Sequence, residues 1–89
     1  MANFVIEFPH STQTCLRELE DLKSQSPDLL SRINWGCMAG KHSGWAMVEA
    51  GSKSDVLNML PASIRGEAGI TEVNKFTPDQ IESMHKMAA

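Results

Sequence analysis

The segment formed by residues 33–50 constrains the fold of this chain more than any other stretch. Two apolar runs lie on either side of a turn at residues 40–44, and the segment holds both tryptophans of the sequence. Glycine adopts the positive φ angles that tight hairpin loops need, and Gly40 and Gly44 bound this turn. The segment therefore predicts a β-hairpin, with strands over residues 33–39 and 44–50.

Two further strands and the first helical region follow from composition and spacing. Residues 3–8 and 70–76 are rich in aromatic and β-branched side chains, which favour strands. A helix is expected over residues 12–24, capped by Ser11 or Thr12, and then a turn or a second short helix that ends at Arg32. The apolar stripe of the first helix comprises Cys15, Leu16, Leu19 and Leu22, and its charged residues, Glu18 among them, are expected to form a solvated face.

Capping patterns predict two more helices. Ser52, with Asp55 three residues later, resembles a capping box before a short helix that ends near Pro61. The sequence at residues 77–80, Thr-Pro-Asp-Gln, places a capping threonine, a proline at the first helical position and a glutamine at the third. The last helix is expected to carry Ile81, Met84 and Met87 or Ala88 inward.

The order of these elements predicts the fold class. The pattern is β-α-β-β-α-β followed by an extra C-terminal helix, which is the split β-α-β arrangement. Right-handed crossovers then give an antiparallel sheet in the order 4-1-3-2, with the two main helices on one face. We therefore expect one α+β domain of ferredoxin-like type, spanning residues 1–89.

The two faces of the predicted sheet differ in character. Phe4, Ile6 and Phe8, together with the small residues of the third strand, suit packing against the helices. An exposed tryptophan and methionine on a central strand are unusual unless another surface covers them. A homodimer that packs open face toward open face is therefore expected. The residues left on the open face are Val5, Glu7, Trp45, Met47 and Glu49.

The bulk composition excludes several classes of protein. A net charge of −3 argues against a general nucleic-acid binder, which would show a basic stripe. No run of about 18 apolar residues is present, so no membrane span is expected. The first residues, MANFVIEF, lack the basic region and cleavage site of a signal peptide. Two cysteines are too few for a disulfide framework, and we expect reduced thiols and a cytoplasmic protein.

The element order, the length and the helix after the fourth strand resemble the dimeric α+β barrel proteins of ferredoxin-like topology. The resemblance covers the whole chain, and the segments WGCMAGKHSGWAMVEA and VNKFTPDQI look similar to small uncharacterised bacterial proteins of that group. The group includes monooxygenases, isomerases, decarboxylating enzymes, haem-degrading enzymes and proteins without known activity. The resemblance implies the fold and a dimer but assigns no catalytic residue or cofactor, because fold does not fix function.

The predicted topology brings several polar loop residues to one rim of the sheet. Strand one ends where the hairpin turns, the first helix begins there, and the return before strand four arrives there. His10, Lys41, His42 and Arg65 are therefore expected beside the amino end of the first helix, which favours an anion such as a carboxylate or a phosphate. The alternative is that these are solvated loop side chains.

The covered sheet face is a second candidate site. Glu7, Glu49 and Glu72, if they lie close together in a partly apolar space, would have raised pKa values and could act as general acid or base. Trp45 and Met47 would hold an apolar substrate. The alternative is that the glutamates pair with basic residues of the partner subunit.

Metal binding and thiol chemistry are two weaker alternatives. Cys37, His10 and His42 lie near one end of the hairpin, and such ligands suit copper(I) or zinc, but no spacing matches a zinc motif. Met84 and Met87 are more typical of a core than of a ligand set. Cys37 could act as a nucleophile beside His42, whereas Cys15 on the apolar stripe is expected to be inert. The sequence analysis therefore assigns no metal ligand and no cofactor.

The leading functional hypothesis is binding of a small apolar or amphipathic molecule with an acidic head. Its tail would contact Trp35, Trp45 and Met47, and its head would lie near His10, His42 and Arg65. If a reaction follows, the hypothesis is cofactor-free proton transfer, as in an isomerase or a monooxygenase-like enzyme, with Glu7 or Glu49 as base and His42 as acid. The alternative is a non-enzymatic dimerisation or regulatory module.

Overall fold

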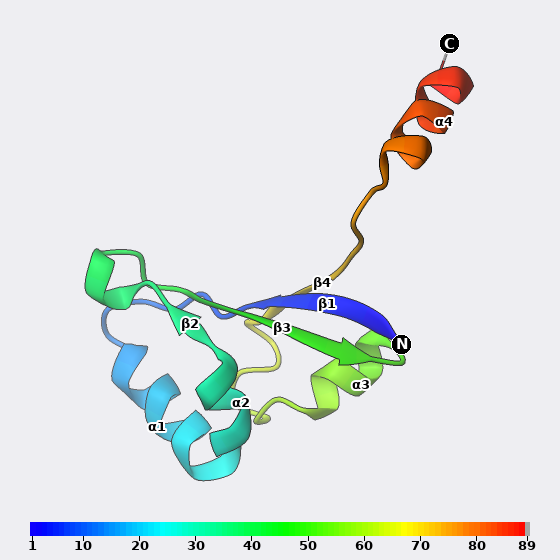
Figure 1. Ribbon diagram of the computed structural model, residues 1–89. Coiled ribbons are helices and arrows are strands. Elements are labelled where there is room, and N and C mark those ends of the chain that lie inside the picture. Colours follow the sequence, from blue (N-terminus) through cyan, green and yellow to red (C-terminus); the bar gives the residue numbers. More distant parts are fainter. Residues whose placement is uncertain (89) are drawn as a thin grey trace.

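The computed structural model describes residues 1–88 of the 89-residue chain, and Figure 1 shows the arrangement of its elements. The described part is 49 Å long and only 21 Å thick, because the last helix stands away from the rest. In chain order the elements are β1 (Ala2–Glu7), α1 (Cys15–Gln25), α2 (Pro27–Arg32), β2 (Asn34–Trp35), the 3₁₀ helix η1 (Cys37–Ala39), β3 (Gly44–Ala50), α3 (Lys53–Asn58), β4 (Gly69–Val73) and α4 (Pro78–Ala88).

The four strands form one antiparallel sheet in the order β2-β3-β1-β4, counted from the β2 edge. In the β1–β3 pair Val5 is opposite Met47 and Phe4 is opposite Val48, so alternate positions of both strands share a face. β1 also pairs with β4 along the other side. The two most apolar strands are therefore the two central ones.

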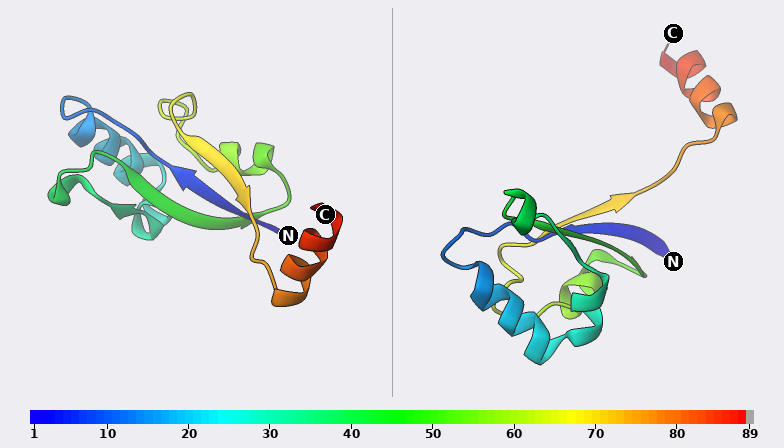
Figure 2. Two further views of the ribbon diagram at one scale, coloured as in Figure 1. Left: turned by 90° about the horizontal axis from the view of Figure 1, so that it is seen from above. Right: turned by 60° about the vertical axis from the view of Figure 1, so that its left-hand side comes forward.

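Helices α1, α2 and α3 all lie on the same face of this sheet (Figure 2). The strand residues that point toward them are buried, which confirms the predicted inner face. The helices contribute Leu22, Leu29 and Val56 to the same core. The buried strand residues are Phe4, Ile6, Ala46, Val48 and Ala50, and Phe8 follows directly after β1.

The chain is an α+β protein, but the prediction of a ferredoxin-like domain is wrong, because the helices are not arranged as in that fold. Two helices, α1 and α2, connect β1 to β2, and α2 confirms the second short helix that was expected to end at Arg32. Pro27 causes this division, since proline cannot extend a helix but fits the first position of a new one. The helix between β3 and β4 has only six residues, and α4 lies away from the sheet.

The second strand is much shorter than predicted. It ends at Trp35, because the chain turns at Gly36 into the 3₁₀ helix, whose last residue is followed by Gly40 with a φ of 92°. The first helix begins at Cys15 rather than at residue 12. Ser11 and Thr14 hydrogen-bond to each other in a turn before it, so neither Ser11 nor Thr12 caps the helix.

The predicted face of α1 is also partly wrong. Leu16 is two-thirds exposed, whereas Glu18, expected on the solvated face, is buried together with Leu22. The inward positions are therefore Cys15, Glu18 and Leu22, which follow the i, i+3, i+7 spacing of one helix face. A carboxylate at an inward position indicates a polar environment beneath the start of this helix.

Trp35 packs across Gly44, its cross-strand partner in the β2–β3 pair. A Cβ atom added at Gly44 would lie 2.5 Å from the Trp35 ring and 2.8 Å from the Ile33 side chain. We expect Gly44→Ala to lower the free energy of unfolding by about 1–3 kcal/mol, the cost of overpacking a well-filled site. Urea denaturation of this variant and of Gly66→Ala, where an added Cβ meets nothing within 4 Å, checks the result. An equal decrease in the free energy of unfolding of both variants would contradict the overpacking at Gly44.

The capping pattern before α4 is confirmed in both directions. The Gln80 amide donates to Thr77 Oγ1, and the Thr77 amide donates to Gln80 Oε1. The expectation that α4 turns Ile81 and Met84 inward is wrong, since both side chains are about half exposed and Met87 is almost fully exposed. In residues 1–88 this helix has no extensive contact with another element.

Candidate metal-binding site

Two cysteines and two histidines converge at the end of the sheet where β1 leads into α1. One ligand atom from each of His10, Cys15, Cys37 and His42 lies within 4.8 Å of the others. Cys37 is central to the cluster: its Sγ lies 3.2 Å from His10 Nε2 and 3.6 Å from Cys15 Sγ. All four residues are partly buried, so the cluster is screened from solvent but reachable.

Hydrogen bonds on the outer side of the cluster orient His10. The His10 Nδ1–H group donates to the Phe8 carbonyl oxygen at 3.2 Å, and the other ring nitrogen, Nε2, is directed at Cys37. In the neutral imidazole with this hydrogen bond, Nε2 is the nitrogen with the free lone pair. The Glu18 carboxylate lies 3.7 Å from the same Nδ1 atom, and both side chains are buried. Metal-binding histidines characteristically direct one ring nitrogen at a carbonyl or carboxylate and the other at the metal.

His42 shows a similar division between its two ring nitrogens. Its Nε2 atom lies 3.3 Å from Thr12 Oγ1, while its Nδ1 atom is buried and has no hydrogen-bond partner. A buried nitrogen without a partner is costly, because it loses its hydrogen bond to water. Coordination of a metal ion through Nδ1 would satisfy this nitrogen and would leave the contact between Nε2 and Thr12 in place.

The backbone holds the two loops of the site together. The His10 amide donates to the His42 carbonyl, and Phe8 and Gly44 exchange two backbone hydrogen bonds just before this point. Cys37 is fixed by the 3₁₀ helix, which the Lys41 amide closes by donating to the Gly36 carbonyl. The cluster therefore rests on sheet pairing and on a tight turn.

Burial affects the titrating groups around the site. Desolvation raises the pKa of the Cys15 thiol above its ordinary value, and the hydrogen bond with Cys37 adds to this shift. Burial also raises the pKa of Glu18 to about 7, with a further contribution from the negative charge of Glu67. Both shifts in pKa favour the neutral forms of these groups in the metal-free chain.

The distances agree with tetrahedral coordination. Zinc lies about 2.3 Å from a thiolate sulfur and about 2.0–2.1 Å from a histidine nitrogen, so tetrahedral ligand atoms are about 3.3–3.8 Å apart. The Cys15–Cys37 and His10–Cys37 separations of 3.6 and 3.2 Å are close to these values. Two of the ligand pairs therefore already have the separation that tetrahedral zinc requires, and the other pairs lie within 4.8 Å.

The residues predicted for the rim are only partly brought together. The imidazole rings of His10 and His42 lie 5.6 Å apart, and the Trp35 ring lies 5.7 Å from that of His10. Arg65 is engaged elsewhere, because its Nε–H group donates to the Leu57 and Leu60 carbonyls at the end of α3. The return segment brings Glu67 to the surface beside His10 instead.

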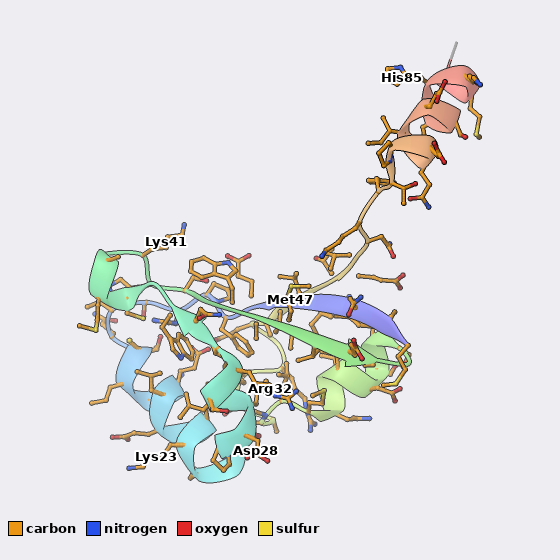
Figure 3. The ribbon with its side chains drawn as sticks, in the orientation of Figure 1. Lys23, Asp28, Arg32, Lys41, Met47 and His85 are labelled. Atoms are coloured by element: carbon orange, nitrogen blue, oxygen red, sulfur yellow. The ribbon has the colours of Figure 1, made fainter. Side chains whose placement is uncertain are left out.

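The residues predicted for the open face lie there, but not as one site. Trp45 is opposite Glu7 in the strand register, and Glu49 is opposite Asn3. Glu7 and Asn3 are four strand positions apart, which separates the two glutamates by about 13 Å along the sheet. Glu72 is opposite Phe4 and so belongs to the other face. Met47 projects from the sheet on the side away from the helices, as Figure 3 shows.

Sequence reasoning missed Cys15 as a partner of the other three residues, because Cys15 was interpreted as core. One signal was present in the spacing. Four residues separate His10 from Cys15, and four residues separate Cys37 from His42 in the reverse order. With the hairpin and the first helix meeting at one rim, this mirrored spacing predicts a four-ligand cluster. Glu18 gave no signal, since its neighbours in the sequence are also charged.

Comparison with known proteins gives no further guide to this site: no family model, no curated protein and no solved structure matches the chain. None of the helices in residues 1–88 combines the length and the hydropathy of a membrane span. The functional argument therefore depends on the geometry of the chain itself.

Proposed function

We propose that this protein binds one transition-metal ion, with zinc as the best-suited ion, through His10, Cys15, Cys37 and His42. The observation that carries the proposal is the convergence of four soft or borderline ligand atoms within 4.8 Å of one another, drawn from two separate segments of the chain, residues 10–15 and 37–42. Two thiolates and two imidazoles are a donor set that selects zinc and, among monovalent ions, copper(I).

Four protein ligands favour a structural role for the ion. Zinc sites that act in catalysis keep one coordination position open for water or substrate, whereas structural sites fill all four with side chains. The ion would connect the segment after β1 to the turn after β2 and would anchor the start of α1. Because the thiols must be reduced to bind it, the proposal agrees with the cytoplasmic location expected from the cysteine content.

Metal titration tests this proposal directly. The protein is freed of metal under a thiol reductant and titrated with Zn²⁺ in competition with a chromophoric chelator. We expect one ion per chain, with an apparent binding free energy of about 10–16 kcal/mol, as structural zinc sites show. Free Zn²⁺ at 100 times the dissociation constant is expected to stabilise the fold by about 2.7 kcal/mol.

Cobalt(II) provides the spectroscopic control for the same site. We expect Co²⁺ to give thiolate-to-metal charge-transfer bands and the visible bands of a tetrahedral complex, both of which Zn²⁺ abolishes by displacement. The His85→Ala variant removes the one histidine outside the cluster, which is exposed on α4, and should bind identically. Absence of the thiolate bands, or equal weakening in the His85 variant, would reject the site.

Binding of a small apolar molecule against Trp45 and Met47 stays a separate hypothesis. The half-buried Trp45 and the exposed Met47 support it, since they offer an apolar surface on the open face. The acidic head would need His10 and His42, which the metal ion would occupy. The two functions therefore compete for the same histidines, and zinc-loaded protein should fail to bind such a ligand.

A further inference from the structure

Helix α4 is an amphipathic element without a packing partner in the part of the chain that the structure describes. It has 11 residues, and isolated helices shorter than about 12–15 residues are only marginally stable in water. Ile81, Met84 and His85 share one side at i, i+3 and i+4 spacing, and Phe76 joins them to form a shallow apolar hollow. Such a helix requires a surface to pack against.

The open face of the sheet is a surface of the matching kind. Its centre is formed by Val5 and Met47, which are opposite each other on the two central strands, with Trp45 beside them. Met47 is 61% exposed, although it lies in the middle of the sheet. Helices α1 to α3 cover only the other face (Figures 2 and 3).

The two surfaces also agree in length and charge. A helix of 11 residues is about 16 Å long and fits along β3, which extends over about 23 Å. The open face carries the exposed carboxylates Glu7 and Glu49. On α4 the acidic Glu82 follows Ile81 and so points away from the apolar side, whereas His85 borders that side and Lys75 precedes the helix.

The linker favours the sheet of another molecule over the sheet of the same chain. Residues 74–77 span at most about 14 Å, and they leave the end of β4 in a direction that carries α4 away from the sheet (Figures 1 and 2). Covering its own sheet would require a full reversal within these four residues. A second sheet facing the first would lie in the path of the helix.

The geometry points to a two-fold symmetric dimer in which α4 of each copy packs on the open sheet face of the other. Exchange of an identical element between protomers is a common route to such dimers. In this dimer the open sheet face of each copy is covered by α4 of its partner, because its own α4 does not cover it. The inference uses none of the four residues of the metal cluster and does not depend on metal binding.

Solution mass and single substitutions test the exchange. Light scattering coupled to size exclusion, on the full chain, is expected to show a dimer. Met47→Asp on the sheet and Ile81→Asp on α4 should each raise the dimer dissociation constant by about 30-fold or more, the effect of losing a central interface residue. Ser83→Asp, two residues along the helix from Ile81 and on its other side, is the matched control and should leave the dimer intact.

Mixing the two weakened variants distinguishes exchange from other arrangements. Met47→Asp keeps a functional α4, and Ile81→Asp keeps a functional sheet face, so an equimolar mixture can form one intact contact. Sedimentation velocity on the mixture is expected to show a heterodimer at concentrations where each variant alone is monomeric. A monomeric wild-type protein would reject the dimer. Dimerisation of Met47→Asp alone would show helix-to-helix pairing, dimerisation of Ile81→Asp alone would show sheet-to-sheet pairing, and either result would reject the exchange.

Discussion

Replacing Cys37 by serine is expected to lower the affinity for Zn²⁺ by at least about 100-fold, because loss of an outer-shell partner alone typically costs 10–100-fold and Cys37 is a direct ligand. Cys37 contacts both His10 and Cys15, so it is the residue that links the cluster. A serine hydroxyl stays protonated at neutral pH and is a harder donor than a thiolate. Competition titration against a chromophoric chelator measures the change.

The neighbouring residue provides a matched control for this substitution. Met38 lies in the same 3₁₀ helix, also contains sulfur, and is fully exposed. Met38→Ser should therefore bind Zn²⁺ as the wild type does. Since Cys37 is outside the buried core, Cys37→Ser should keep the circular dichroism spectrum of the metal-free protein. A Cys37 variant that binds zinc normally would show that the four residues do not act together.

The strand pattern was the part of this fold that local sequence could predict. Alternation along residues 44–50 separates inward from outward side chains, and the structure confirms both sets, with Ala46 and Val48 buried and Met47 exposed. The prediction succeeds because successive side chains of a strand point to opposite faces of the sheet. When one face is covered, every second residue must therefore be apolar. The capping box at Thr77 succeeded for a similar reason, since both hydrogen bonds are local.

The helices were harder to predict, because their packing depends on partners far away in the sequence. Leu16 fits the apolar stripe of α1 as well as Leu22 does, yet Leu16 is exposed and Glu18 is buried. The polar cluster beneath the start of the helix decides this rotation. For α4 the sequence gives an apolar side but not the surface that it covers, so the expectation of inward packing within one chain was wrong.

The candidate site depends on the same long-range information. His10 and His42 were expected at one rim, and the structure places them there. The apolar stripe predicts that Cys15 is a core residue, although Cys15 also begins α1 and so lies at the end of the helix nearest the rim. The cluster is recognised from the distance between Cys15 and Cys37. The spacing of residues within the segment 10–15, or within the segment 37–42, does not give this distance.

The Cys15–Cys37 pair is expected to make metal binding sensitive to oxidation. The two sulfur atoms lie 3.6 Å apart, against about 2.05 Å in a disulfide bond, and no other residue separates them in the hydrogen bond that they form. Hydrogen peroxide would accept two electrons and two protons from the two thiols, forming one S–S bond and two molecules of water. The disulfide sulfurs no longer carry the negative charge that zinc requires.

Oxidation of the zinc-loaded protein should therefore release one Zn²⁺ ion for each disulfide formed. Oxidation of the metal-free protein should proceed faster, because its thiolates are not bound to zinc. A chromophoric zinc indicator follows the release, and mass spectrometry of the denatured chain detects the loss of two hydrogen atoms. Addition of a thiol reductant should restore zinc binding, since a disulfide, unlike a sulfinic acid, is reversible. Retention of zinc by chains that contain the Cys15–Cys37 disulfide would show that at least one of these thiolates is not a ligand.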